Sequence, residues 1–197
     1  MQALHNPPHL SYYKLLERDL DECFRFIEPI ESHFEVHSME FSRIILMASS
    51  EIENALKSFD VVAATIAKSK NILGYHSPVT SEFPKFCTME MFLPRCDLVF
   101  TPWSEWSEIK APDWWTNGYN KIKHDRVSNP GAATMRRAIY AVGALQALLH
   151  HLYRLKYPDG WLADNAAPKI IVPHESNAVI PGASTLWRPD LPDDPTE

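Results

Sequence analysis

The 197-residue chain is poor in glycine and cysteine, with six glycines and three cysteines. Neither GxGxxG nor GxxxxGK[ST] occurs, so we expect no nucleotide site of the Rossmann or P-loop type. The chain also lacks a G-x-S-x-G elbow, a CxxC pair and an HExxH motif. The usual enzyme signatures are therefore absent, and any chemistry must come from a less common arrangement of residues.

Three cysteines, Cys23, Cys87 and Cys96, are too few and odd in number for a disulfide framework. We expect reduced thiols in a cytoplasmic protein. The first residues show no basic stretch followed by an apolar one, so we expect no secretory signal. The longest apolar run, residues 138–149, is about half of the ~20 residues that a membrane-spanning helix needs. A hydrophobic content of 45% excludes a disordered chain.

The net charge of −6 is unevenly distributed along the chain. Residues 1–113 carry a net charge of −7 and residues 158–197 one of −5, whereas residues 114–157 carry +6. A basic block inside an acidic protein attracts polyanions, of which nucleic acid is the commonest. Alternatively, these cations pair with acidic helices of the same chain or of a second subunit. The charge pattern leaves both interpretations open.

Hydrophobic periodicity predicts an all-α protein, an up-and-down bundle of four to five helices. The predicted helices span residues 11–28, 38–59, 113–125 and 130–155. We expect Ser11, Asp113 and Asn129 to be N-caps, with Pro130 at the first position of the last helix. The segment 61–70 either continues the second helix or begins a new one.

The composition divides the chain into two parts. Residues 1–157 form the helical domain, and residues 71–112 within it form an irregular insert because five prolines interrupt any long helix. A short β-hairpin is predicted in this insert, with strands at 86–92 and 97–101. Residues 158–197 form a proline-rich, acidic extension that we expect to be partly disordered, with one strand at 169–172.

A polar stripe marks the helix predicted at 113–125. Helical spacing places Asp113, Asn117, Asn120 and His124 on one face. We expect Asn120, one turn before His124, to hydrogen-bond the imidazole and select its tautomer. A histidine among cations can accept a proton from a ribose 2′-hydroxyl while the cations hold the phosphate. No metal or cofactor is needed for this reaction. The alternative is a buried polar network with no chemical role.

Two segments carry a resemblance to a known family. The segments FSRIILMASSEIENALK (Phe41–Lys57) and WWTNGYNKIKHDR (Trp114–Arg126), followed by a long Ala-rich helix, resemble the HEPN superfamily. The resemblance covers roughly residues 11–157. It implies a helical bundle that forms homodimers and binds RNA. Many members are metal-independent endoribonucleases of toxin–antitoxin, CRISPR and phage-defence systems. Their site is an arginine followed, after four to six residues, by a histidine.

The resemblance assigns roles to individual residues. His124 takes the place of the family's histidine, and Asn120 that of its polar residue. The arginine position falls on Tyr119 or Asn117, and Arg126 is the candidate to replace it. The predicted RNA-binding residues are Lys121, Lys123, Arg136 and Arg137. The alternative function is that of a non-catalytic subunit that acts by binding a protein partner.

Three weaker candidates remain. His33 and His37 have the spacing of two metal ligands on a helix, but a third ligand is missing and we expect no metal site. His150 and His151 are interpreted as structural or as a polar edge of the bundle. Four tryptophans could stack on unpaired bases, although a core position is more common for this residue. They are Trp103, Trp106, Trp114 and Trp115.

Overall fold

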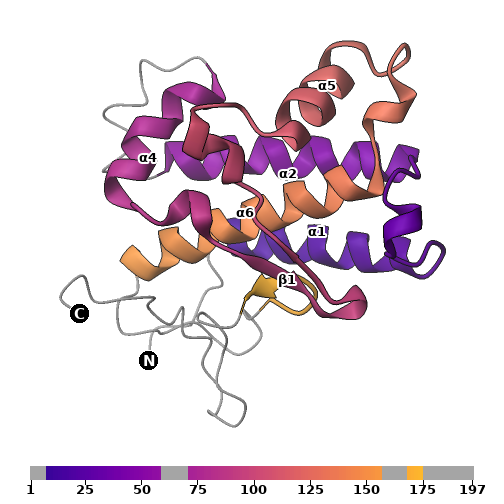
Figure 1. Cartoon of the computed structure of the whole chain (residues 1–197), viewed down its shortest axis with the longest axis horizontal. Coiled ribbons are helices and arrows are strands. Elements are labelled where there is room, and N and C mark those ends of the chain that lie inside the picture. The colour runs from indigo at the N-terminus through magenta and orange to yellow at the C-terminus, as the bar shows by residue number, and fades with distance from the viewer. Residues whose placement is uncertain (1–7, 59–70, 157–167, 175–197) are drawn as a thin grey trace, which may run out of the picture.

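The computed structural model describes residues 8–58, 71–156 and 168–174. This part of the chain is mostly helical with a small antiparallel sheet, so the predicted fold class is confirmed. Its α-helices are α1 (Pro8–Phe24), α2 (Met39–Lys57), α4 (His76–Glu82), α5 (Lys121–Asp125) and α6 (Met135–Lys156), shown in Figure 1. The segment 61–70 and most of the predicted C-terminal extension lie outside the described residues.

Three long helices form the centre of the molecule. α2 and α6 start side by side, where the amide of Met135 donates to the carbonyl of Val36 at 2.9 Å, and they run in the same direction (Figure 1). α1 runs the opposite way, as the contact of His9 at its start with Glu51 near the end of α2 shows. α5 and the segment before it pack on α2 and α6.

The second helix begins where its sequence predicts. Ser38 is extended and caps the helix, since its Oγ accepts the amide hydrogen of Phe41 at 3.0 Å, so the predicted start is confirmed. α1 begins at Pro8, since proline is compatible with the first turn of a helix; Ser11 therefore lies within α1, and its N-cap prediction is wrong. It ends at Phe24, one turn before the predicted end.

The last helix begins five residues later than predicted. Pro130–Ala132 forms a single 3₁₀ turn, so the N-cap prediction for Asn129 is wrong. The cap is Thr134 instead, whose Oγ1 accepts the amide hydrogen of Arg137 at 3.3 Å. An Asn-Pro pair suits a turn as well as a helix start, and only the later threonine supplies the capping bond.

α6 is the most deeply buried helix. All six predicted core-face residues are buried: Met135, Ile139, Val142, Leu145, Leu149 and Leu152. On another face, a Cβ added to Gly143 would lie 2.6 Å from the ring of Phe100, so only glycine allows this close approach. Even so, none of the described helices combines the length and apolar content needed to cross a membrane.

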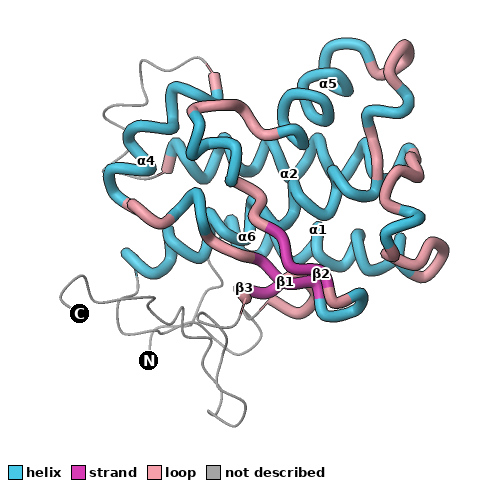
Figure 2. Tube along the Cα trace, viewed as in Figure 1, coloured by secondary structure: helices cyan, strands magenta, loops and turns pink. Residues whose placement is uncertain are grey.

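The insert contains the predicted hairpin, and a third strand joins it from the C-terminal segment. The sheet has the order β2-β1-β3 and is antiparallel (Figure 2). Its strands are β1 (Met91–Leu93), β2 (Leu98–Phe100) and β3 (Val172–Pro173). The first predicted strand is too long, because Phe86–Thr88 forms a 3₁₀ turn. Asp97 closes the hairpin with a φ of 54°, a conformation that aspartate tolerates.

A buried carboxylate fastens the C-terminal segment to α1. Glu17 is only 4% exposed, and its Oε1 accepts the amide hydrogens of Lys169 at 2.5 Å and Ile170 at 2.6 Å. The hydroxyl of Tyr13 lies 3.1 Å from the same oxygen and 3.2 Å from the carbonyl of Ile171. Backbone amides next to a carboxylate compensate for its lost hydration, so Glu17 is both buried and satisfied.

Candidate functional site

The segment that carries the polar stripe is helical, but its first half is a π-helix. Residues Trp114–Asn120 form π-helical turns, which are wider than α turns, and lead directly into α5. Apolar residues of this segment face the bundle and are buried: Trp114, Trp115, Tyr119 and Ile122. π-Helical turns are rare and occur frequently at functional sites, which makes this segment the first place to look for one.

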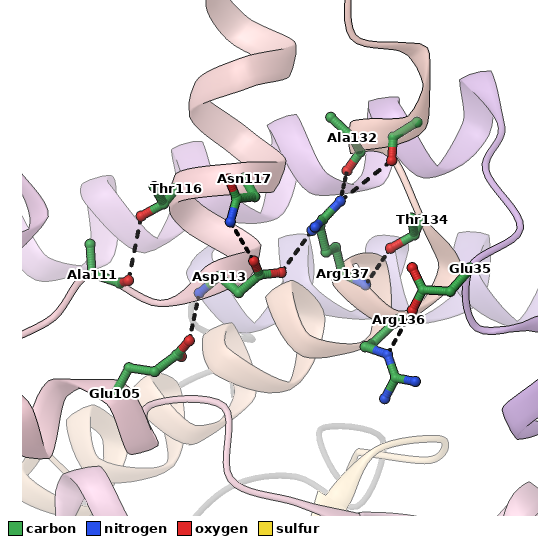
Figure 3. Close-up of polar contacts among 11 residues, drawn as sticks. Glu35, Glu105, Ala111, Asp113, Thr116, Asn117, Ala132, Thr134, Arg136 and Arg137 are labelled. Atoms are coloured by element: carbon green, nitrogen blue, oxygen red, sulfur yellow. Dashed lines mark hydrogen bonds and ion pairs between the residues drawn. The ribbon is translucent and has the colours of Figure 1, made fainter.

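Asp113 binds side chains rather than capping the helix. Its backbone is already helical and its side chain makes no cap bond, so the N-cap prediction is wrong. One carboxylate oxygen accepts from Nδ2 of Asn117 at 2.6 Å, and the other pairs with Nε of Arg137 at 2.8 Å (Figure 3). Arg137 also donates from Nη1 to the carbonyl of Ala132 at 3.2 Å. Arg137, predicted to bind RNA, thus joins α6 to the π-helical segment.

The pKa values of two neighbouring carboxylates, Asp113 and Glu105, are shifted in opposite directions. Burial raises the pKa of Asp113, but hydrogen bonds from Arg137 and Asn117 outweigh this effect and bring it below its usual value. Glu105 accepts the amide hydrogen of Asp113 at 3.0 Å (Figure 3). Burial, reinforced by the charge of Asp113, raises the pKa of Glu105. At neutral pH Asp113 is therefore ionised opposite Arg137.

The ion pair makes a testable contribution to stability. We expect Asp113→Asn to lower the free energy of unfolding by about 1 kcal/mol at neutral pH, since the pair is partly exposed. Because the folded-state pKa is lowered, the advantage of the wild type is complete above about pH 4 and disappears as the pH falls through the lowered value. Urea unfolding of both proteins between pH 3 and 7 measures it. A difference that stays constant over this range would contradict the assignment.

The predicted stripe is divided into two parts. Asp113 and Asn117 hydrogen-bond to each other and Asp113 pairs with Arg137, whereas Asn120 is half-buried outside this network and His124 is exposed. No hydrogen bond joins Asn120 to His124 in the described chain, so the expected selection of the tautomer is not observed. The wide π-helical turns before Asn120 change the angular spacing that a regular α-helix would give. His124 therefore has an imidazole open to solvent.

Two lysines flank His124 on the same short helix. Lys121 and Lys123 are both exposed. Lys123 donates from Nζ to the hydroxyl of Tyr119 at 3.2 Å and lies 5.0 Å from the centre of its ring. This hydrogen bond raises the pKa of Lys123, so the lysine is charged at neutral pH. Among the described residues, neither lysine forms an ion pair with a carboxylate.

Three arginines of the basic block, Arg126, Arg136 and Arg137, make contacts within the chain. Arg126 extends toward the start of α2, where its Nη1 lies 2.7 Å from Sδ of Met39, and makes no hydrogen bond to His124. Arg136 pairs through Nε with Glu35 at 3.0 Å and covers the ring of Phe34 at 4.9 Å. Arg126 and Arg136 therefore make their contacts within the chain. Within α5 itself, the cations beside His124 are the lysines Lys121 and Lys123.

The remaining histidine candidates have other surroundings. His33 lies in a 3₁₀ turn and contacts the carbonyl of Glu28 through Nδ1 at 2.9 Å, and His37 is exposed. No group of three metal-binding side chains is assembled in the described chain. His150 and His151 are 1% and 6% exposed, so their interpretation as a polar edge is wrong and they belong to the interior.

The four tryptophans belong to the core. Trp103, Trp106, Trp114 and Trp115 are all buried, so none of them forms a platform for an unpaired base. The indole of Trp103 donates to the carbonyl of Ala144 at 3.1 Å, and that of Trp114 to the carbonyl of Pro102 at 2.8 Å. These bonds anchor the insert to the bundle.

The cysteines are free, and burial raises the pKa of Cys23 to about 11, so this thiol is unreactive at neutral pH.

Comparison with known proteins gives no relative: no family model, no curated protein and no solved structure matches this chain. The site must be judged on its own geometry. Sequence reasoning identified the exposed histidine and its lysines, but it missed the pairing of Asp113 with Arg137. The opposite charges of these residues, at the starts of two neighbouring helices, were the available signal.

Proposed function

We propose that this chain is an HEPN-like protein that binds RNA through the exposed face of α5 and cleaves it without a metal ion, with His124 as the general base. One observation carries the proposal. His124 is exposed on a five-residue helix beside Lys121 and Lys123, neither of which is paired with a carboxylate in the described chain. Unpaired cations next to a solvent-accessible imidazole suit a phosphodiester substrate.

The reaction follows from the chemistry of RNA. The imidazole of His124 accepts the proton of a ribose 2′-hydroxyl, and the 2′-oxygen attacks the adjacent phosphorus. The bond from phosphorus to the 5′-oxygen breaks, and that oxygen takes up a proton. The products are a 2′,3′-cyclic phosphate and a free 5′-hydroxyl. Lys121 and Lys123 hold the phosphate and stabilise the charge that grows on its oxygens.

A second copy of the chain completes the proposed site. The resemblance to HEPN proteins implies a homodimer in which two such histidines meet across the symmetry axis. The exposure of His124 and the half-burial of Asn120 are compatible with that arrangement, since both side chains are accessible from outside the protomer. A toxin–antitoxin or phage-defence role is the biological setting that the resemblance suggests.

A non-catalytic binding role is the second candidate. Its specific support is the position of the arginines: Arg126 lies against Met39, and Tyr119 occupies the motif's arginine position as a buried aromatic residue. A site without an arginine beside the scissile phosphate binds RNA but stabilises the transition state less. RNA that is bound and remains intact would select this candidate.

Binding is tested by replacing the two lysines. We expect Lys121→Ala/Lys123→Ala to weaken binding of single-stranded RNA about tenfold and to reduce the slope of log K against log salt by about 1.4, since two phosphate contacts are lost. Fluorescence anisotropy at several salt concentrations measures both quantities. Lys57→Ala/Lys110→Ala, which removes exposed lysines elsewhere, is the matched control. An equal loss in both variants, or no binding by the wild type, would contradict the proposal.

A further inference from the structure

Three polar side chains meet where the start of α1 reaches the end of α2, the end that lies toward α4 in Figure 1. His9 comes from α1, and Glu51 and Ser58 come from the last turns of α2 and its C-cap. Nδ1 of His9 lies 2.7 Å from Oε1 of Glu51, and Nε2 lies 3.1 Å from Oγ of Ser58. These contacts join residues more than forty positions apart in the sequence.

The contact with Glu51 determines which nitrogen of His9 holds the proton in the neutral ring. A carboxylate only accepts hydrogen bonds, so Nδ1 carries the hydrogen at 2.7 Å and Nε2 is left with a lone pair. The contact at 3.1 Å then requires the hydroxyl of Ser58 to donate to Nε2. The same hydroxyl lies 2.8 Å from the carbonyl of Ala55, so its one proton has two possible acceptors.

Solvent exposure decreases from Ser58 through His9 to Glu51. Ser58 is exposed to solvent, the side chain of His9 is 20% exposed and that of Glu51 is 11% exposed. A reagent can therefore reach the hydroxyl, while the carboxylate behind the imidazole is shielded from water.

We propose that Ser58, His9 and Glu51 form a nucleophile, general base and positioning carboxylate, and that Ser58 accepts an acyl group from a carboxylic ester. A hydroxyl hydrogen-bonded to an imidazole that a carboxylate orients is the arrangement that activates serine nucleophiles. This site shares no residue with the α5 face, so it stands whether or not the chain binds RNA.

The proposed reaction is a nucleophilic substitution at the ester carbonyl. Oγ of Ser58 attacks the carbonyl carbon, and its proton passes to Nε2 of His9. The tetrahedral intermediate then breaks the bond to the alcohol oxygen, which takes the proton from the imidazolium. Water, deprotonated by His9, releases the acid from the acyl-serine. The proton of Ser58 thus leaves on the alcohol, a proton from water passes through His9 to the released oxygen of Ser58, and no metal or redox partner takes part.

Covalent labelling of the full-length protein tests the proposal. A fluorophosphonate probe reacts with activated serines, whose oxygen displaces fluoride from phosphorus. We expect the wild type to be labelled, with the adduct mapped to Ser58 by peptide mass spectrometry. His9→Ala should slow labelling at least about 100-fold, the scale of a lost general base. Ser50, exposed on the same helix without a histidine partner in the described chain, is the internal control.

If these three side chains only hold α1 against α2, the labelling result is different. Ser58 then reacts no faster than Ser50 in the folded wild type, and this result would overturn the proposal. The wild-type comparison does not depend on whether any variant folds. For the positioning residue, we expect Glu51→Gln to slow labelling of Ser58 and Glu51→Asp to restore part of the rate. Melting temperatures of all variants separate these rate effects from loss of structure.

Discussion

Replacing His124 with alanine is expected to slow RNA cleavage in EDTA by about 10²–10⁴-fold, which is the contribution typical of a general base. The imidazole is exposed and makes no side-chain hydrogen bond in the described chain, so its removal should leave the fold unchanged. RNA binding should be nearly retained, because Lys121 and Lys123 are still present. Gel analysis of a labelled single-stranded RNA over time gives the rate.

The matched control for this experiment is His37→Ala. His37 is also exposed, but it lies before α2 and outside the basic helix. The control should cleave at the wild-type rate and give the same products, which should carry cyclic phosphate ends. Equal cleavage by the His124 and His37 variants would show that a contaminant or another residue performs the reaction. Cleavage that stops in EDTA would contradict a metal-independent mechanism.

Replacing Glu17 with alanine is expected to release the C-terminal segment from the bundle. Two backbone amides and the hydroxyl of Tyr13 lose a shared acceptor that is almost completely buried. Hydrogen bonds to a charged group contribute about 1.5–3 kcal/mol each, so the docked state should weaken by about 3 kcal/mol even if water replaces part of them. β3 is held by this contact and by its pairing with β1.

Hydrogen exchange measures this release directly. We expect the amides of Lys169 and Ile170 to exchange on the order of 100-fold faster in Glu17→Ala, while the central amides of α6 are less affected. Glu22→Ala removes an exposed carboxylate from the same helix and should leave the exchange unchanged. Unchanged protection of the 168–174 segment in Glu17→Ala would contradict the role assigned to Glu17.

The sequence predicted the fold where periodicity and capping agreed. α2 begins directly after Ser38, where its regular apolar stripe predicts the start, and the serine caps it. α6 has the predicted buried face but a different first residue, because Asn129-Pro130 suits a turn and Thr134 supplies the cap. The hairpin was recognisable from two apolar runs. The strand expected at 169–172 is found as β3 at Val172–Pro173, but no local pattern indicates its pairing with β1, which is distant in sequence.

The candidate site was predictable only in part. The exposure of His124 follows from helical spacing, since Ile122 and Tyr119 turn the opposite face inward. The π-helical turns could not be foreseen, because the polar stripe was read with regular α-helical spacing and no local motif marks the wider turns. The use of Arg137 by Asp113 is a contact between two helices, and periodicity within each helix contains no information about its partner.

Photocrosslinking is the most direct measurement of where RNA binds. A single-stranded RNA containing 4-thiouridine, irradiated with the purified protein and mapped by mass spectrometry, should attach to peptides that contain residues 119–126. Competition with unlabelled RNA should remove these adducts, and the Lys121→Ala/Lys123→Ala protein should form few of them. Crosslinks confined to other helices, or none at concentrations where RNA is bound, would contradict the assignment of the α5 face as the binding surface.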